Sequence, residues 1–217
     1  MDNIIEIIHE SNPIVNISGV KDMVSEENAE KILSGHDIVL CLVDNMVARV
    51  IVHRAAYKMN LPCITMSGAP KHRAIVSTFM PNRVDYETGF GIPTAGKPLD
   101  EAAKKVIVSL KKERAEYSAK LGADPGWAKL YISGEREFWA VTPMRTFPTA
   151  AFAAQEAINY LVYGEEGIIA KAPDARIYDL EGKVFEDLGI AQSQNVKITE
   201  AIVKDVLKPK NKIYRRF

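Results

Sequence analysis

The feature of the sequence that most restricts its fold is a strand that runs into an acid and an amide and then into a helix. Residues 37–49 read Asp-Ile-Val-Leu-Cys-Leu-Val-Asp-Asn-Met-Val-Ala-Arg. The apolar run 38–43 predicts a buried parallel strand, because such strands are covered on both faces. Asp44 and Asn45 then open a helix, and a further strand is expected from residue 61. This alternation predicts an α/β fold with parallel strands and right-handed crossovers.

The rest of the chain adds helices to both sides of this unit and changes the character of the sheet. Residues 175–188 resemble a hairpin, which makes the second half more antiparallel and favours a mixed sheet. Ser25 is expected to cap the second of the helices. The further predicted elements are helices at 2–10, 25–33, 99–121 and 149–163, strands at 14–20 and 74–80, and a loop at 88–98.

Composition excludes several classes of function. The 217 residues carry 28 Lys plus Arg and 28 Asp plus Glu, so no net field attracts nucleic acid or a membrane surface. No apolar run has the length of a membrane span, and the N-terminus lacks the basic start of a signal peptide. The two cysteines, Cys41 and Cys63, fall in predicted strands and are expected to be core residues rather than a disulfide. A reducing cytoplasm is the expected location.

The best candidate site is the end of the first strand of this unit, because open α/β sheets bind ligands at the carboxyl ends of their strands. Asp44 would hold a Mg²⁺ ion that bridges nucleotide phosphates, a role for which one carboxylate suffices. Asn45 would contact the nucleotide, and Arg49 would reach a phosphate or a partner carboxylate. The alternatives remain open at this point: Asp44 or Asn45 caps the helix, and Arg49 is a solvated residue or forms a local ion pair.

Other chemical signals in the chain are weak. No strand is followed by a glycine-rich turn and a helix, which argues against an NAD-type dinucleotide site and leaves the chain without its own phosphate cradle. Cys63 has apolar neighbours and is expected to be buried rather than a reactive thiol. His53 and Arg54 are expected at the surface or in an interface, and the four histidines show no metal-binding spacing.

From residue 4 to 80 the chain resembles the ThiF/MoeB/HesA family of ubiquitin-activating-type adenylating enzymes. The resemblance rests on the order of Asn12-Pro13, the strand 14–20, the Asp-Asn-x-x-x-Arg element at 44–49, and Ser67-Gly68-Ala69 before a strand ending at Met80-Pro81. It implies a Rossmann-like mixed sheet in a single domain over 1–217, with 85–145 as a helical insertion or crossover region. It also implies that ATP and Mg²⁺ are bound through Asp44, with Asn45 and Arg49 adjoining the nucleotide.

The same resemblance implies an activity, and it also implies that part of the nucleotide site is missing from this sequence. The family adenylates the C-terminal carboxylate of a ubiquitin-like or sulfur-carrier protein, but its glycine-rich nucleotide loop lies before the helix with which this sequence begins. The chain is therefore expected to be N-terminally truncated relative to the family, and to need a complementing chain for catalysis. The alternative is a non-catalytic scaffold or partner subunit that binds no nucleotide. In both cases a homodimer or a heterodimer with a ThiF-like chain is expected to cover the exposed sheet edge.

Overall fold

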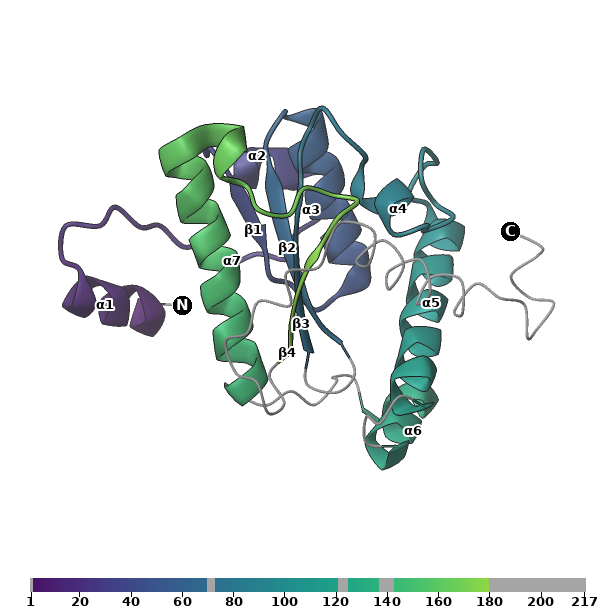
Figure 1. Cartoon of the computed structure of the whole chain (residues 1–217). Coiled ribbons are helices and arrows are strands. Elements are labelled where there is room, and N and C mark those ends of the chain that lie inside the picture. Colours follow the sequence, from purple (N-terminus) through teal and green to yellow (C-terminus); the bar gives the residue numbers. More distant parts are fainter. Residues whose placement is uncertain (1, 70–72, 121–124, 137–142, 180–217) are drawn as a thin grey trace.

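In the computed structural model, residues 2–69, 73–120, 125–136 and 143–179 are described, and they form a mixed sheet with helices on both faces (Figure 1). The sheet has four strands in the order β1-β2-β3-β4. β1 pairs parallel with β2, whereas the β2–β3 and β3–β4 pairs are antiparallel. The strands are β1 Val39–Cys41, β2 Cys63–Ala69, β3 Arg73–Phe79 and β4 Arg176–Asp179. The α/β fold and the mixed sheet predicted from the sequence are therefore confirmed.

The helices divide between the two faces of the sheet. α7 (Pro143–Tyr163) packs along β2 and β3 on one face, whereas α3 (Met46–Lys58) lies against β1 and β2 on the other. α5 forms a further layer outside α3. It packs against α3, and α6 packs against α5. The remaining helices are α1 Asp2–Ser11, α2 Ala29–Leu33, α4 Tyr86–Gly89, α5 Glu101–Lys120, α6 Pro125–Ser133 and the short 3₁₀ helix η1 Gly164–Gly167.

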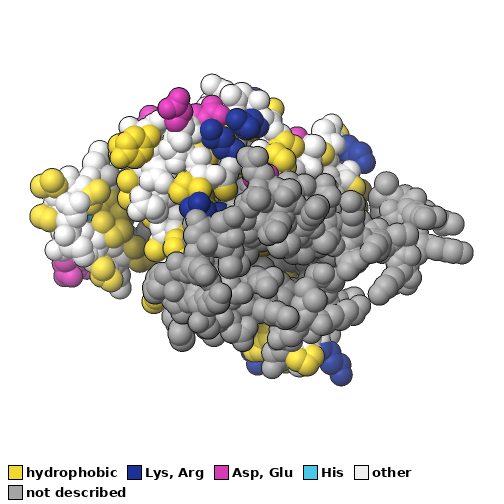
Figure 2. All heavy atoms as spheres, in the orientation of Figure 1, with side chains coloured by type: hydrophobic (Ala, Val, Ile, Leu, Met, Phe, Trp, Pro, Cys, Tyr) yellow, Lys and Arg dark blue, Asp and Glu magenta, His cyan; other side chains and the backbone are white. Residues whose placement is uncertain are grey.

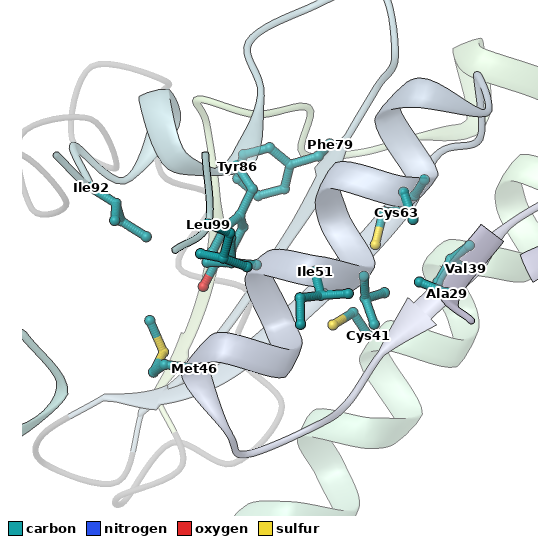
Figure 3. Close-up of a cluster of buried hydrophobic side chains, with 14 of the residues drawn as sticks. Ala29, Val39, Cys41, Met46, Ile51, Cys63, Phe79, Tyr86, Ile92 and Leu99 are labelled. Atoms are coloured by element: carbon teal, nitrogen blue, oxygen red, sulfur yellow. The ribbon is translucent and has the colours of Figure 1, made fainter. Parts of the chain in front are cut away.

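Two hydrophobic clusters follow from this arrangement because alternate strand residues face opposite sides of the sheet. The larger cluster lies between the sheet and the layer of α3, α4 and α5, and its members include Cys41, Cys63 and Phe79 (Figure 3). The smaller cluster lies under α7, where Ile64 and Val76 meet Ala153 and Ala157. The alanine-rich side of α7 is what lets this helix approach the sheet closely.

Most elements lie where the sequence predicts them, but the strand expected at 14–20 is wrong. These residues are described and carry no strand assignment, and Ile14 is 92% exposed. A β-branched, alternating sequence forms a strand only when a neighbour completes its hydrogen-bond ladder. No described strand lies beside this segment.

Two helix starts also differ from expectation. α2 begins at Ala29, and Asn28 rather than Ser25 precedes it, without a side-chain cap. α7 begins at Pro143 and includes Pro148 in its first turns. It ends at Tyr163, before Gly164 with a positive φ of 65°, as the glycine predicts. The second strand of the expected hairpin, 183–188, lies outside the described residues.

β1 is an edge strand of the described sheet. The Val39 amide donates to the carbonyl of Pro62 at 2.9 Å, and the register pairs Val39 with Cys63 and Cys41 with Thr65. In such a ladder Val39 and Cys41 bond to β2, so the amide and carbonyl of Leu40 point to the unpaired side. Among the described strands, the sheet therefore has an open edge immediately before the candidate site.

Candidate functional site

The candidate site lies where β1 leads into α3, and its first residue of interest is Asn45. Asn45 is the N-cap of α3: its side-chain oxygen accepts hydrogen bonds from the amides of Val47 at 2.9 Å and Ala48 at 3.0 Å. This arrangement satisfies two amide groups that would otherwise lack partners at the helix start. The capping alternative drawn from the sequence is therefore correct for Asn45, and its side-chain oxygen is already engaged.

Asp44 precedes Asn45 and is exposed. It stands at the carboxyl end of β1 and next to the positive end of the α3 dipole, a position that favours negatively charged groups. It also lies beside the open edge of the sheet. Its carboxylate is thus placed to meet a ligand or a neighbouring chain from solvent.

Arg49 turns back toward the strand from the first turns of α3. Its Nε and Nη2 atoms donate to the carbonyl oxygen of Val43, at 3.2 Å and 2.6 Å. This pair of hydrogen bonds fixes the last carbonyl before Asp44, so Arg49 holds the shape of the strand–helix turn. The three residues predicted from the sequence are therefore adjacent in space: Asn45 and Arg49 hydrogen-bond within the turn, and Asp44 is exposed to solvent.

A Mg²⁺–nucleotide fits this turn in part. Mg²⁺ is commonly held by one or two carboxylates together with phosphate oxygens, and Asp44 supplies one. No group of three His, Cys, Asp or Glu side chains among the described residues is arranged to hold a metal without a nucleotide. The amides of Val47 and Ala48 are taken by Asn45, which leaves little of the α3 N-terminus for phosphates. The phosphate cradle must come from other residues.

A buried group of one thiol and several rings lies between α3 and β2; the burial of Cys63 was predicted from the sequence, whereas that of His53 was not. His53 is 3% exposed, and its Nε2 lies 3.8 Å from the sulfur of Cys63. The imidazole stacks on Tyr86 at 4.1 Å between ring centroids and meets Phe79 edge-on. Burial lowers the pKa of His53 and raises the pKa of the Cys63 thiol. Both groups are therefore neutral core residues at neutral pH, and the expected surface position of His53 is wrong.

Arg54 is partly exposed, which agrees with the expected position at the surface or in an interface. It makes a two-pronged ion pair with the carboxylate of Glu87, at 2.6 Å from Nε and 2.8 Å from Nη2. Glu87 is 3% exposed and also accepts from the hydroxyl of Thr94. The hydrogen bond to Glu87 raises the pKa of Arg54. This pair ties α4 to α3, and a separation of 33 residues left no local signal of it in the sequence.

Comparison with known proteins places these features in a family. Residues 2–195 match the profile of the ThiF family. A crystal structure of selenomethionine PaaA has a TM-score of 0.54 and 14% sequence identity, over 85% of this chain and 55% of that chain. The chain thus spans about half the length of PaaA, and at this identity the likeness shows the fold alone. No curated protein matches the sequence. No helix among the described residues is long and apolar enough to cross a membrane.

Proposed function

Because the ThiF family profile matches nearly the whole sequence, the chain belongs to the ThiF family, and we propose that it acts in carboxylate activation. The substrate would be the C-terminal carboxylate of a ubiquitin-like or sulfur-carrier protein. A carboxylate oxygen attacks the α-phosphorus of ATP, the bond from that phosphorus to the bridging oxygen breaks, and pyrophosphate leaves. The product is an acyl-adenylate, and Mg²⁺ bound with the nucleotide would neutralise charge on the phosphates.

The observation that carries this proposal is the exposed Asp44 at the end of a parallel strand, in the Asp-Asn-x-x-x-Arg element. Asp44 would hold the metal, and Asn45 and Arg49 would adjoin the nucleotide. The hydrogen bonds of Asn45 to α3 and of Arg49 to the carbonyl of Val43 fix the turn, so Asp44 does not have to be ordered when the ligand binds. Such preorganisation is worth most where catalysis depends on positioning and charge.

We further propose that a second chain completes the nucleotide site. β1 is at the edge of the described sheet, and ligands of open α/β sheets sit between the ends of two neighbouring strands. Asp44 is therefore on one wall of a crevice whose other wall would come from a ThiF-like partner with the glycine-rich loop. The resulting heterodimer would act in the cytoplasm, where the two buried thiols of this chain would stay reduced.

A scaffold that binds no nucleotide is the second candidate. Two observations favour it: the side-chain oxygen of Asn45 is occupied by the helix cap, and Arg49 donates to a backbone carbonyl. In this alternative, Asp44 would only stabilise the α3 N-terminus, and the chain would serve as a partner subunit.

Nuclear magnetic resonance of the isotopically labelled chain separates the two candidates. On addition of millimolar Mg²⁺–ATP to the labelled chain in complex with a ThiF-like chain that supplies the glycine-rich loop, the adenylation proposal predicts amide shifts in the β1–α3 turn that are weakened in Asp44→Asn. Asp37→Asn is a matched control, because Asp37 is also an exposed acid but precedes β1. Shifts that are absent, or equal in both variants, would favour the scaffold.

The activity itself is measured in a complex with a ThiF-like chain that supplies the glycine-rich loop. ATP–pyrophosphate exchange by that complex should fall by about 100-fold or more in Asp44→Ala, as for other charge-stabilising groups at transition states. Exchange that is unchanged by Asp44→Ala contradicts the role proposed for this carboxylate.

A further inference from the structure

Two exposed leucines lie on the face of the sheet that α7 covers only in part. Val39, Cys41 and Val43 pack in the cluster on the α3 side. Because alternate strand residues face opposite sides of a sheet, Leu40 and Leu42 face the α7 side. α7 contacts β1 on this face, yet Leu40 and Leu42 are 38% and 44% exposed. Apolar area therefore remains uncovered between α7 and the open edge of the sheet.

α7 adds two exposed apolar side chains to the same area. Ala153 faces the sheet, and Glu156 lies on the flank above β3, where it accepts a hydrogen bond from the hydroxyl of Thr78 at 3.4 Å. At about 100° per residue, Ile158 and Leu161 fall on the opposite flank, which faces β1. They are 53% and 58% exposed, and Figure 2 shows hydrophobic side chains along the visible part of α7. We call Leu40, Leu42, Ile158 and Leu161 the β1–α7 surface.

The width of a helix indicates what would cover the β1–α7 surface. Neighbouring strands lie about 4.8 Å apart and packed helices about 8–10 Å apart, so one helix covers about two strands. α7 already lies over β2 and β3. The next helix on this face would therefore rest on β1 and on a further strand at the open edge. A strand and a helix together fit this surface, whereas a helix alone would leave half of its apolar side exposed.

The topology of the described chain fixes the face on which that helix lies. The parallel unit β1–α3–β2 extends the sheet in one direction, with α3 on the face opposite α7. Crossovers between parallel strands are right-handed, so a unit that extends the sheet in the other direction from β1 carries its helix on the α7 face. Ligands of open α/β sheets bind where the direction of extension changes, at the carboxyl ends of the strands. Asp44 follows β1 at this point.

The start of α3 gives the same answer from the side of the phosphates. Asn45 occupies the amides of Val47 and Ala48, so α3 does not offer them to an anion. A helix on the β1–α7 surface, preceded by a strand parallel to β1, begins at the edge where Asp44 lies. Its free N-terminal amides would then face the phosphates.

We propose that the β1–α7 surface is the docking site for a strand–turn–helix unit of the complementing chain. The strand pairs parallel with β1 through the unpaired amide and carbonyl of Leu40, and the helix packs on the four apolar side chains. This inference rests on the proposed function, because the glycine-rich turn of that unit is the one that completes the nucleotide site. None of the four side chains is charged, so the docking side of the helix is apolar.

A binding measurement tests the docking site. The probe is the strand–glycine-rich turn–helix segment of a ThiF-family adenylating enzyme, added as a separate polypeptide to the full, isotopically labelled chain. Binding should shift the amide resonance of Leu40, and Ile158→Glu should raise the dissociation constant by about 30-fold or more, as for a charge placed at an interface hot spot. Val108→Glu is the control and should leave it unchanged, because Val108 is 46% exposed on α5.

A wild-type chain that does not bind the probe, or equal weakening by the two variants, would overturn the proposal. Circular dichroism checks that each variant is folded, and Ile158→Gln replaces Ile158→Glu if that variant is not. A wild-type chain that dimerises alone, and dissociates in Ile158→Glu, would assign the surface to a second copy and also overturn the proposal.

A nitroxide label tests on which face the helix lies. Both native cysteines are buried, so Leu161→Cys and Val108→Cys each give a single accessible labelling site. The label at position 161 should broaden the resonances of the probe helix, and the label at position 108 should not. Broadening from position 108 alone, or from neither position, contradicts the placement.

The same complex separates this inference from the proposed function. If Ile158→Glu weakens binding but Asp44→Ala leaves ATP–pyrophosphate exchange unchanged, the docking site stands and the proposed function fails. If exchange depends on Asp44 but Ile158→Glu binds as the wild type does, the docking site alone fails.

Discussion

The described residues cover the apolar side chains on one side of the sheet more completely than those on the other. On the side of α3, α4 and α5, apolar residues are buried in one cluster, and the charged groups Arg54 and Glu87 meet in a two-pronged pair. Toward α1, β1 and α7, the chain exposes Leu40 beside an open strand edge and a line of apolar residues on a helix. The described residues bury the first region among themselves, whereas they leave apolar and backbone groups of the second region exposed.

This difference bears on the candidate site, because Asp44 and Asn45 lie at the border between the two regions. The closed side supplies α3 and the hydrogen bonds that fix the turn. The open side is where a neighbouring strand would bring the rest of a nucleotide site. Substitutions on the closed side should therefore reduce the stability of the single chain, and those on the open side should change association instead.

The largest effect is expected for truncation in the closed core. Ile107 is fully buried on α5, so Ile107→Ala should lower the free energy of unfolding by about 2–5 kcal/mol, the usual cost of a buried cavity. Its neighbour Val108 faces solvent, and Val108→Ala should stay within about 0.5 kcal/mol. Urea denaturation measures both. Equal losses at the two positions would mean that α5 is not packed as described.

The next effect concerns the ion pairs that α3 makes. Glu87→Gln leaves Arg54 without its carboxylate, and should cost about 2–3 kcal/mol, below the full cost of breaking a buried pair because Arg54 is partly exposed. Lys58 on the same helix pairs with Glu30 at 2.6 Å, but both side chains are well exposed. Glu30→Gln should therefore change stability by less than about 1 kcal/mol. A similar loss for the two substitutions would mean that burial does not set the Arg54–Glu87 pair apart from the exposed Lys58–Glu30 pair.

How far the sequence predicts the structure also follows this division. The strands β1 and β2 and the helix α3 are visible in the sequence because local periodicity and capping agree with their final packing. The Arg54–Glu87 pair and the stack of His53 on Tyr86 are not, because they join distant segments. The strand prediction for residues 14–20 is wrong for the opposite reason. The local pattern is that of a strand, but no described strand pairs with this segment.

The candidate site was predictable as a place, but the functions of its side chains were not. The spacing of Asp44, Asn45 and Arg49 locates them at a strand end, and the structure confirms that they share one turn. Spacing alone does not show that the oxygen of Asn45 caps α3 or that Arg49 bonds to the carbonyl of Val43. These roles depend on backbone geometry at the turn, which a one-dimensional pattern leaves undetermined.

A smaller effect is expected at the border itself. Asn45→Ala removes the cap of α3, and should lower the free energy of unfolding by about 1 kcal/mol. Asn45→Ser keeps a capping oxygen and should restore most of that loss. Thermal or urea unfolding measures both variants. If Asn45→Ser is as unstable as Asn45→Ala, the contribution of Asn45 lies in a contact other than the helix cap.

The smallest effect on the stability of the single chain is expected on the open side. Leu161→Gln changes an apolar side chain on the outer side of α7 that is 58% exposed, so the unfolding free energy should change by less than about 0.5 kcal/mol. Urea denaturation measures the variant beside the wild type. A loss near that of Ile107→Ala would show that the chain buries this side of α7 itself, and the contrast between the two sides of the sheet would disappear.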